Sequence, residues 1–192
     1  MPPARAADRE PRYFPRPGLS PGVAMLVAAG LLRPRDRILE VGCGTGSDAL
    51  ALACIGFRRV AGIDISRRSI AQARARARRA KVDVRFEIGD ATRLQAFPPA
   101  SFDAVVDTLM SNNLREAGLR RYAGEAARVL RPEGLLVMQT KVLARGQPPR
   151  LPVAFRRRFS FGPAVRTTLP QHPIGSRWVD VAAYVGRRKT AR

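Results

Sequence analysis

The sequence predicts an α/β protein with a doubly wound, mostly parallel sheet and helices on both faces. Short apolar runs alternate five times with helical patterns, which is typical of right-handed crossover units in a parallel sheet. A glycine-rich turn, Gly42–Gly46, follows the first of these runs. With 192 residues and 45% hydrophobic content, the chain suits one such domain and is too short for two ordinary ones.

The N-terminal part divides into an arm and the start of the domain. Residues 1–20 are rich in Pro and Arg and predict an arm or lid. Residues 21–192 are expected to form a single domain. Its first element is a short buried helix over 21–32, ended by Pro34.

The middle of the chain supplies the parallel strands and their crossover helices. Continuous or alternating apolar, β-rich runs predict strands over residues 37–41, 59–65, 82–88, 102–107 and 135–142. Amphipathic or Ala/Leu-rich runs predict helices over residues 47–56, 67–80 and 115–130. Ser47 and Ser66 are the expected caps of the first two helices.

The alternation fails after residue 143. Residues 145–152 predict a linker or loop, and 153–159 a short helix. Strands are expected over 163–169 and 177–185, with no helix between them that is long enough for a crossover. Adjacent strands without a crossover are antiparallel.

The net charge is +20, from 35 Lys and Arg against 15 Asp and Glu. All but three of the basic residues are Arg, which is typical of coding bias that places Arg on tolerant surfaces. An anionic partner, either nucleic acid or a phosphorylated or carboxylated metabolite, is the alternative. Residues 145–192 hold eleven basic residues against one acid, Asp180. Under this alternative, the anionic partner would meet this part of the chain.

The cysteines and the N-terminal pattern favour a cytoplasmic protein without a metal site. Cys43 and Cys54 are too few for a disulfide framework or a metal quartet. Residues 1–12 carry charges and prolines but no apolar stretch of a secretory signal. The helical run 23–32 is too short to span a bilayer. We expect no membrane partner and leave the oligomeric state open.

The glycines of "LEVGCGTG" (39–46) predict a ligand close to the backbone. A turn between the first strand and the next helix lacks Cβ atoms at Gly42, Gly44 and Gly46, so a ligand can approach. The helix N-terminus adds partial positive charge for a carboxylate or phosphate. The spacing G-x-G-x-G differs from the dinucleotide form G-x-G-x-x-G. A tight turn without a ligand is the alternative.

Three acids stand at or near the ends of three successive strands. Glu40 could receive an ammonium group, and Asp64 could accept two hydrogen bonds from vicinal ribose hydroxyls. Asp90 could accept from the exocyclic amine of a base. Asp64 as a helix cap and Asp90 as a turn residue are the alternatives. Together the acids predict a ligand with an amine, a ribose and an amino-substituted base.

Five motifs in order resemble those of class I S-adenosylmethionine-dependent methyltransferases. They are "LEVGCGTG", "GIDIS", "IGDATRL", "FDAVVD" and "RVLRPEGLLVMQT". The resemblance covers residues 22–142 well and the final strand more loosely. It implies a seven-stranded sheet of order 3-2-1-4-5-7-6 whose last strand is antiparallel. It also implies S-adenosylmethionine as the cofactor.

The resemblance assigns cofactor contacts position by position. Glu40 and the Gly42–Gly46 loop, which includes Cys43, would hold the methionine end. Asp64 would hold the ribose and Ile65 would pack on the adenine, while Asp90 would meet its amino group and the Ala91 N–H its ring. Asp107 would lie near the methyl-bearing sulfur. Cys43 is interpreted as a small filler rather than a nucleophile.

The acceptor side of the reaction is less defined. Asp107 and His172 are the candidates for a catalytic base. Tyr13 (with Phe14), Asn112 and Asn113 are candidate substrate contacts, although the two Asn residues have equal claim as turn residues. The stretch after the fourth strand reads "DTLMSNNL" and lacks the Asn/Asp-Pro-Pro-aromatic motif of amino-group methylation.

Three functions stay open at this point. The favoured one is methyl transfer to a small-molecule acceptor, possibly anionic. The second is methylation of nucleic acid, especially RNA, with the basic C-terminal third tracking phosphates. The third is a non-catalytic protein that binds S-adenosylmethionine.

Overall fold

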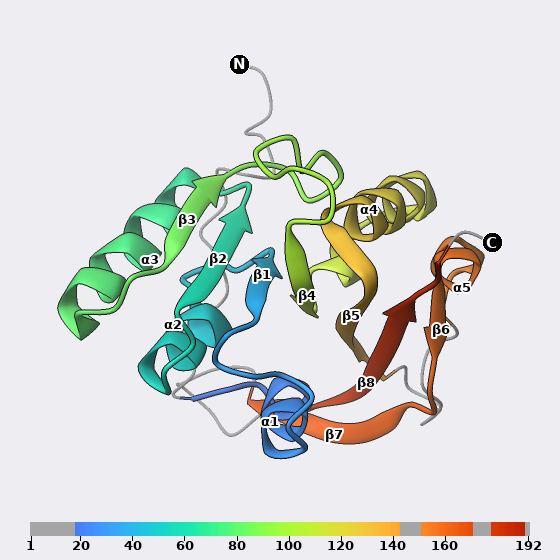
Figure 1. Cartoon of the computed structure of the whole chain (residues 1–192), viewed down its shortest axis with the longest axis horizontal. Coiled ribbons are helices and arrows are strands. Elements are labelled where there is room, and N and C mark those ends of the chain that lie inside the picture. The colour runs from blue at the N-terminus through green and yellow to red at the C-terminus, as the bar shows by residue number, and fades with distance from the viewer. Residues whose placement is uncertain (1–17, 143–150, 171–177, 191–192) are drawn as a thin grey trace.

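The computed structural model describes residues 18–142, 151–170 and 178–190. Its strands are β1 (Arg37–Val41), β2 (Arg59–Asp64), β3 (Arg85–Ile88), β4 (Phe102–Thr108), β5 (Leu130–Lys141), β6 (Phe159–Phe161), β7 (Val165–Pro170) and β8 (Trp178–Arg188). They form one sheet of order β3-β2-β1-β4-β5-β8-β6, with β7 also paired to β8, and this order runs from left to right in Figure 1.

The predicted strand order is confirmed, with one refinement at the edge. Strands β1 to β5 are parallel, and β8 is antiparallel to β5. Beyond β8, β6 pairs with its end at 186–188 and β7 with 178–183. The Gly162 N–H, which follows β6, also donates to the Val185 carbonyl of β8 at 3.3 Å. The strand predicted to lie at the edge, beside the last strand, is therefore formed in two pieces, β6 and β7. The sequence predicted only the second piece.

Helices cover both faces of the sheet. They are α1 (Pro21–Ala28), α2 (Ser47–Cys54), α3 (Arg67–Ala80), α4 (Glu116–Val129) and α5 (Val153–Arg158), with a short 3-10 turn at Ser111–Asn113. Successive strand residues point to opposite faces. Ile38 packs in a core with α1, α2 and α3, whereas Leu39 packs in a second core with α4 and α5.

The observed helix ends agree with the sequence prediction at the start of α3 and differ from it at the start of α2 and the end of α1. The Ser66 hydroxyl accepts from the Ser69 N–H at 3.2 Å, so the predicted cap of α3 is confirmed. The predicted cap of α2 is wrong, because Gly46 occupies the N-cap position with φ of 78° and Ser47 is the first helical residue. Helix α1 ends at Ala28, well before Pro34.

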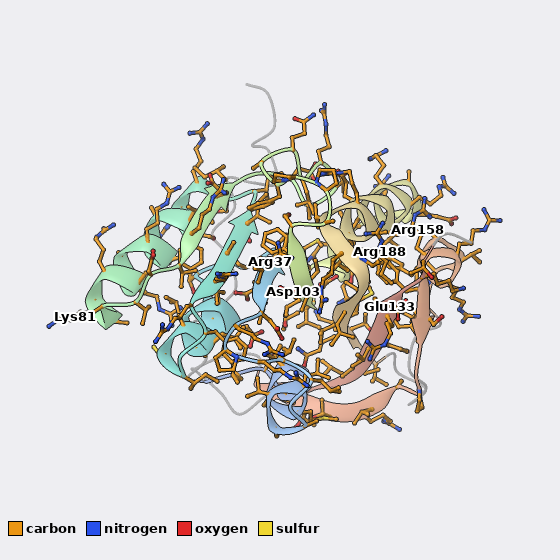
Figure 2. All side chains as sticks on the ribbon, viewed as in Figure 1. Arg37, Lys81, Asp103, Glu133, Arg158 and Arg188 are labelled. Atoms are coloured by element: carbon orange, nitrogen blue, oxygen red, sulfur yellow. The ribbon has the colours of Figure 1, made fainter. Side chains whose placement is uncertain are left out.

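The strand ends opposite the glycine turn are tied by charge. Asp103 of β4 accepts from the Arg37 backbone N–H at 2.7 Å and from its guanidinium at 3.1 Å. Arg131 pairs with the other Asp103 oxygen at 2.6 Å. Figure 2 shows Arg37 and Asp103 close together near the middle of the sheet, while Arg158 and Arg188 lie toward the α5 side and Lys81 at the far end of α3.

No helix in the described ranges has the length and apolar character needed to cross a membrane.

Candidate functional site

The Gly42–Gly46 turn lies between the carboxyl ends of β2 and β4. It follows Val41, which pairs with Ile63 on one side and Asp107 on the other. The Cys43 N–H donates to the Ile63 carbonyl at 3.0 Å, and the Gly46 N–H donates to the Cys43 carbonyl at 2.8 Å. The loop is therefore a fixed turn at the edge where open α/β sheets bind ligands.

The three glycines of this turn are required for different reasons. All three have positive φ, which other residues rarely adopt. A Cβ at Gly42 would collide with the Met110 side chain, and one at Gly46 would lie 2.6 Å from the Phe86 ring. A Cβ at Gly44 would meet nothing within 4 Å. Packing thus explains Gly42 and Gly46, whereas Gly44 faces open space.

Glu40 is nearly buried beneath the turn. Its Oε2 accepts from the Ala49 N–H at 2.8 Å, in the first turn of α2, where a carboxylate is favoured by the helix dipole. Burial raises the pKa of the neighbouring Cys43 thiol well above its usual value, and the charges of Glu40 and Asp64 raise it further. The thiol is therefore held neutral, which agrees with the interpretation of Cys43 as a filler.

Arg76 is a site residue that the sequence analysis missed. It belongs to the charged side of α3, which usually faces solvent. Its Nη1 donates instead to the Thr45 carbonyl at 2.7 Å and to the Thr45 hydroxyl at 3.1 Å. Burial lowers the pKa of Arg76, while the nearby Glu40 charge opposes this shift. Arg76 thus braces the glycine turn from the neighbouring helix, and nothing in its spacing distinguishes it from the other arginines of α3.

Asp64 joins the end of β2 to the glycine turn. One carboxylate oxygen accepts from the Gly44 N–H at 2.8 Å and the other from the Ser66 N–H at 2.8 Å. A carboxylate has about four acceptor positions, so these bonds leave capacity on both oxygens. Asp64 is half-buried, and it lies beside the open space at Gly44.

Two exposed apolar side chains stand at neighbouring strand ends. Ile65 is 58% exposed and Ile88 is 41% exposed. Asp64 and Ile88 are register partners of β2 and β3, which places both isoleucines at one edge of the sheet. Ile88 was not singled out from the sequence, because the end of an alternating strand carries no sign of exposure.

The end of β3 leads into a polar turn. Asp90 is exposed, and its Oδ1 accepts from the Thr92 N–H at 2.7 Å. Ala91 is buried beside it. The structure therefore brings Gly44, Asp64, Ile65 and Asp90 to the same edge, as the sequence predicted for successive strand ends.

Asp107 is fully buried at the end of β4. Its Oδ1 accepts from the Met110 and Ser111 N–H groups at 2.9 and 3.2 Å, so it holds the turn that follows the strand. Burial raises the pKa of Asp107 to about 6. Burial, with the Asp107 charge, also raises the pKa of the Tyr122 phenol well above its usual value. The carboxylate supports a turn from within the protein and is screened from solvent.

The other candidate acceptor contacts are only partly described. Asn112 and Asn113 are exposed after β4, and both donate from their side-chain amides to the Leu109 carbonyl at 3.3 and 3.4 Å. They therefore act at least as turn residues. Tyr13, Phe14 and His172 lie outside the described residues.

A buried polar network, also missed from the sequence, fixes the start of α1 beside β4 and β5. Asp48 accepts from the Ser20 N–H at 2.5 Å and from the Thr108 hydroxyl at 2.9 Å. Gln139 donates to the Ser20 and Thr108 hydroxyls at 2.6 and 3.0 Å. The Gln139 carbonyl oxygen accepts from the Gly22 N–H at 3.1 Å. Ser20, the residue before α1, therefore lies beside the first turn of α2 and the end of β4.

Across the described ranges, no group of His, Cys, Asp and Glu is arranged to hold a metal ion. The arrangement instead suits an organic ligand. A half-buried carboxylate with free acceptor capacity lies between an open backbone turn and two exposed aliphatic side chains. Such a set can bind a diol beside a flat apolar ring.

Residues 38–134 match the family model described as methyltransferase domain. The 27-O-demethylrifamycin SV methyltransferase of Amycolatopsis mediterranei (strain S699) is 41% identical over 111 residues, covering 56% of this chain and 39% of that protein. An S-adenosyl-L-methionine-dependent Diels-Alderase of Talaromyces variabilis is 42% identical over 102 residues, covering 52% of this chain and 34% of that protein.

A solved structure supports the same relationship over more of the chain. It is described as "Conversion of a Disulfide Bond into a Thioacetal Group during Echinomycin Biosynthesis". Its TM-score is 0.76 at 26% identity, and the match covers 93% of this chain and 86% of that chain. The chain spans well under half the length of the two curated relatives. With the family model covering about half of its residues, the chain belongs to the methyltransferase domain family, the class I S-adenosylmethionine-dependent methyltransferases.

Proposed function

We propose that this protein transfers a methyl group from S-adenosylmethionine to a small-molecule acceptor, at the carboxyl edge of β1, β2, β3 and β4. The open space at Gly44, next to the Asp64 carboxylate, carries the proposal. The positive φ of Gly44 favours glycine, and because a Cβ there would meet nothing within 4 Å, the turn leaves open space beside the carboxylate in which a ligand can lie.

The residues at this edge fit the parts of the cofactor. Asp64 would accept from the ribose hydroxyls, with its orientation fixed by the Gly44 and Ser66 N–H groups. Ile65 and Ile88 offer exposed aliphatic surface to the adenine ring. Asp90, the Ala91 N–H and the loop with Glu40 beneath it complete the set that the family resemblance assigns.

For methyl transfer, the main task of the protein is to hold the acceptor in position against the cofactor. When bound, the cofactor supplies a methyl group on a sulfonium, which is a good leaving group. Holding an acceptor in line with that methyl lowers the entropic part of the barrier. Asp107 would act indirectly, because it fixes the 108–111 turn, and the Met110 side chain of that turn packs against Gly42. A base is needed only for an acceptor that must lose a proton early.

Two observations favour a small-molecule acceptor. The names of two similar proteins refer to rifamycin and echinomycin, which favours a small molecule. The stretch "DTLMSNNL" lacks the motif of amino-group methylation of adenine, cytosine or glutamine. The Diels-Alderase relative supports a second candidate, in which bound cofactor donates no methyl group. We also propose residues 1–20 as an arm or lid, because the network holds Ser20 beside Thr108 at the end of β4.

Replacing Gly44 tests the cofactor site. Asn tolerates positive φ better than other residues, so Gly44→Asn keeps the turn and fills the open space. We expect S-adenosylmethionine binding to weaken by about 1–3 kcal/mol, the scale of lost polar contacts to a charged ligand, as measured by isothermal titration calorimetry. Gly30→Asn is the matched control, because Gly30 has φ of 66° and also faces open space, after α1.

Equal affinities for wild-type protein and Gly44→Asn would exclude the cofactor from this turn. Methyl transfer itself is measured with cofactor labelled in the methyl group, against candidate acceptors grouped by chemistry. Tight cofactor binding without label transfer to any acceptor would favour the second candidate.

A further inference from the structure

The outer side of α4 carries a pocket of about 600 Å³, within the usual size of small-ligand sites. We call it the arginine pocket. Its lining comes from the loop after β3, from α4 and from the end of α5: Thr92, Arg93, Gln95, Arg120, Arg121, Gly124, Glu125, Arg128 and Arg158. None of the strand-end acids or the turn glycines lines it. It is therefore separate from the proposed cofactor site.

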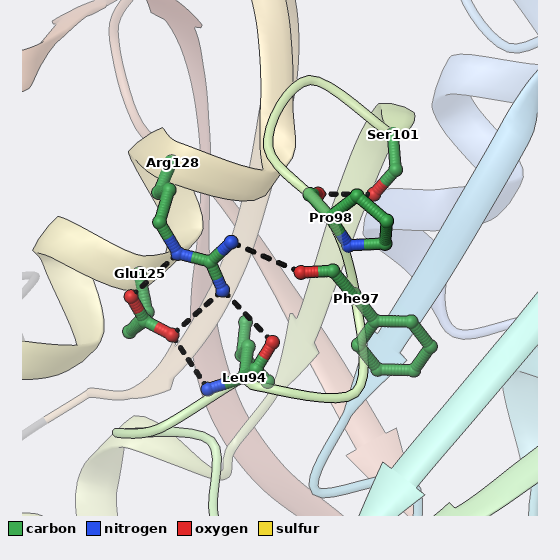
Figure 3. Close-up of polar contacts among 6 residues, drawn as sticks. All are labelled: Leu94, Phe97, Pro98, Ser101, Glu125 and Arg128. Atoms are coloured by element: carbon green, nitrogen blue, oxygen red, sulfur yellow. Dashed lines mark hydrogen bonds and ion pairs between the residues drawn. The ribbon is translucent and has the colours of Figure 1, made fainter.

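One wall of the arginine pocket is held by an ion pair. Residues 89–101 connect β3 to β4 without a helix. Arg128 of α4 donates to the Leu94 carbonyl at 2.8 Å and to the Phe97 carbonyl at 3.0 Å. Glu125 accepts from the Leu94 N–H at 2.6 Å, and Figure 3 shows this clamp joining α4 to the loop. The wall is thus preformed.

The opposite wall and the floor are also fixed. Helix α5 packs on α4 through an edge-to-face contact of Tyr122 and Phe155, whose ring centroids are 5.6 Å apart. Gly124 lines the pocket within α4, where glycine costs about 1 kcal/mol relative to alanine. Apart from the nearby backbone of α4 itself, the nearest atom to a Cβ there would be Arg158 Nη2, at 3.9 Å. Packing does not require this glycine, and its absent side chain widens the pocket.

The charge of the arginine pocket is strongly positive. Glu125 is the one acid in its lining, and the Arg128 guanidinium donates to both of its carboxylate oxygens, at 2.8 and 2.9 Å. Arg120 pairs with Glu116, but this pair is exposed and such pairs contribute little. Within the described parts of the chain, the guanidinium groups of Arg93 and Arg121 make no hydrogen bond or ion pair, and both residues are exposed. Guanidinium groups without partners around a concave site suit phosphate oxygens, which they bind in a bidentate manner.

We propose that the arginine pocket binds a compact ligand with two or more phosphate groups. The pocket is open to solvent, and its arginines come from three neighbouring segments around one depression. This grouping favours a compact ligand over a nucleic-acid strand, which needs an extended track of charge. The net charge of +20 attracts any anion to the whole surface. The experiment therefore has to distinguish binding of an anion at the arginine pocket from attraction of the anion to the whole basic surface.

The test is calorimetric titration of the full chain with inorganic tripolyphosphate at physiological salt. Arg93→Gln/Arg121→Gln removes the two unpaired arginines of the pocket. Arg67→Gln/Arg78→Gln removes the same charge from the exposed side of α3. We expect the pocket variant to bind about tenfold more weakly or worse, from lost charged hydrogen bonds, and the α3 variant to bind nearly as wild type. Equal weakening in both variants would mean general attraction and overturn the proposal.

A second pair of variants changes shape at constant charge. Gly124→Leu fills the pocket, whereas Gly124→Ala adds one methyl group at ordinary contact distance. We expect Gly124→Leu to lose most of the affinity for tripolyphosphate and Gly124→Ala to keep more of it. Unchanged affinity in Gly124→Leu would overturn the proposal.

Two further measurements complete the test. A single-stranded RNA that binds wild-type protein more tightly than tripolyphosphate, and equally in Gly124→Leu, would overturn the proposal in favour of a nucleic-acid surface. Binding of S-adenosylmethionine is measured in parallel and should be the same in all four variants. The proposed phosphate site and the proposed cofactor site are therefore tested independently of each other.

Discussion

Asp107 is a buried carboxylate whose ionisation costs the folded state free energy. The unfolded chain has a pKa of 3.8 for this group, while burial raises the folded value to about 6. Between these values the folded protein binds more protons than the unfolded chain, so the free energy of unfolding falls as pH rises. At about 1.4 kcal/mol per pKa unit, the loss approaches about 3 kcal/mol and is complete above pH 6–7.

The variant Asp107→Asn tests this dependence. Its side-chain oxygen can still accept from the Met110 and Ser111 N–H groups, but it cannot ionise. We expect the stability of Asp107→Asn relative to wild type to rise by about 2–2.5 kcal/mol from pH 4 to pH 8, measured by urea unfolding. Asp83→Asn, at an exposed position, should follow wild type. If the free energy of unfolding changed with pH in the same way for Asp107→Asn and wild type, the raised pKa of Asp107 would be contradicted.

Single residues also show where the sequence sufficed for the site and where it did not. Asp64 and Asp90 were predicted to share an edge because the carboxyl ends of parallel strands coincide, and the structure confirms the shared edge. Arg76 could not be chosen among the arginines of α3, since its partner Thr45 lies 31 residues away. The packing reason for Gly42 likewise depends on Met110, which follows a different strand.

At the scale of elements, the connection between β3 and β4 depends on side chains instead of a helix. Arg128→Ala would remove two hydrogen bonds to carbonyls of this loop and the ion pair of Glu125, which would keep only the Leu94 N–H. We expect the free energy of unfolding to fall by about 1–3 kcal/mol, measured by urea denaturation. Arg115→Ala, at an exposed position before α4, should change it little. A loss shared by both variants would reflect helix propensity or net charge instead of the clamp.

The elements that the sequence predicted well are those with local signals. The strand at 37–41 and the helix at 67–80 have the predicted bounds because their apolar periods and the Ser66 cap are contained in the segments themselves. The β6 piece at 159–161 was missed because three residues carry no period, and its pairing depends on Gly186 of β8. The cap of α2 was misassigned because Gly46 adopts the left-handed conformation that the turn imposes.

At the scale of the whole molecule, the Asp48 network joins segments that are far apart in the chain. Asp48→Ala would leave the Ser20 N–H and the Thr108 hydroxyl without this acceptor in a buried place. We expect a loss of about 2–4 kcal/mol and faster hydrogen exchange in α1 than in α3, measured by mass spectrometry. Glu116→Ala, at an exposed position, is the control. Equal acceleration in both helices would mean that α1 is not anchored by this network.

The two-piece edge strand has a consequence for behaviour at high concentration. Outer strands with unsatisfied amides can recruit another copy into a shared ladder. Here β6 has three residues and β7 six, with an interruption at 162–164 between them. This edge therefore offers a neighbouring copy no long, straight strand to pair with. We expect the interruption to disfavour the growth of fibrils from this edge.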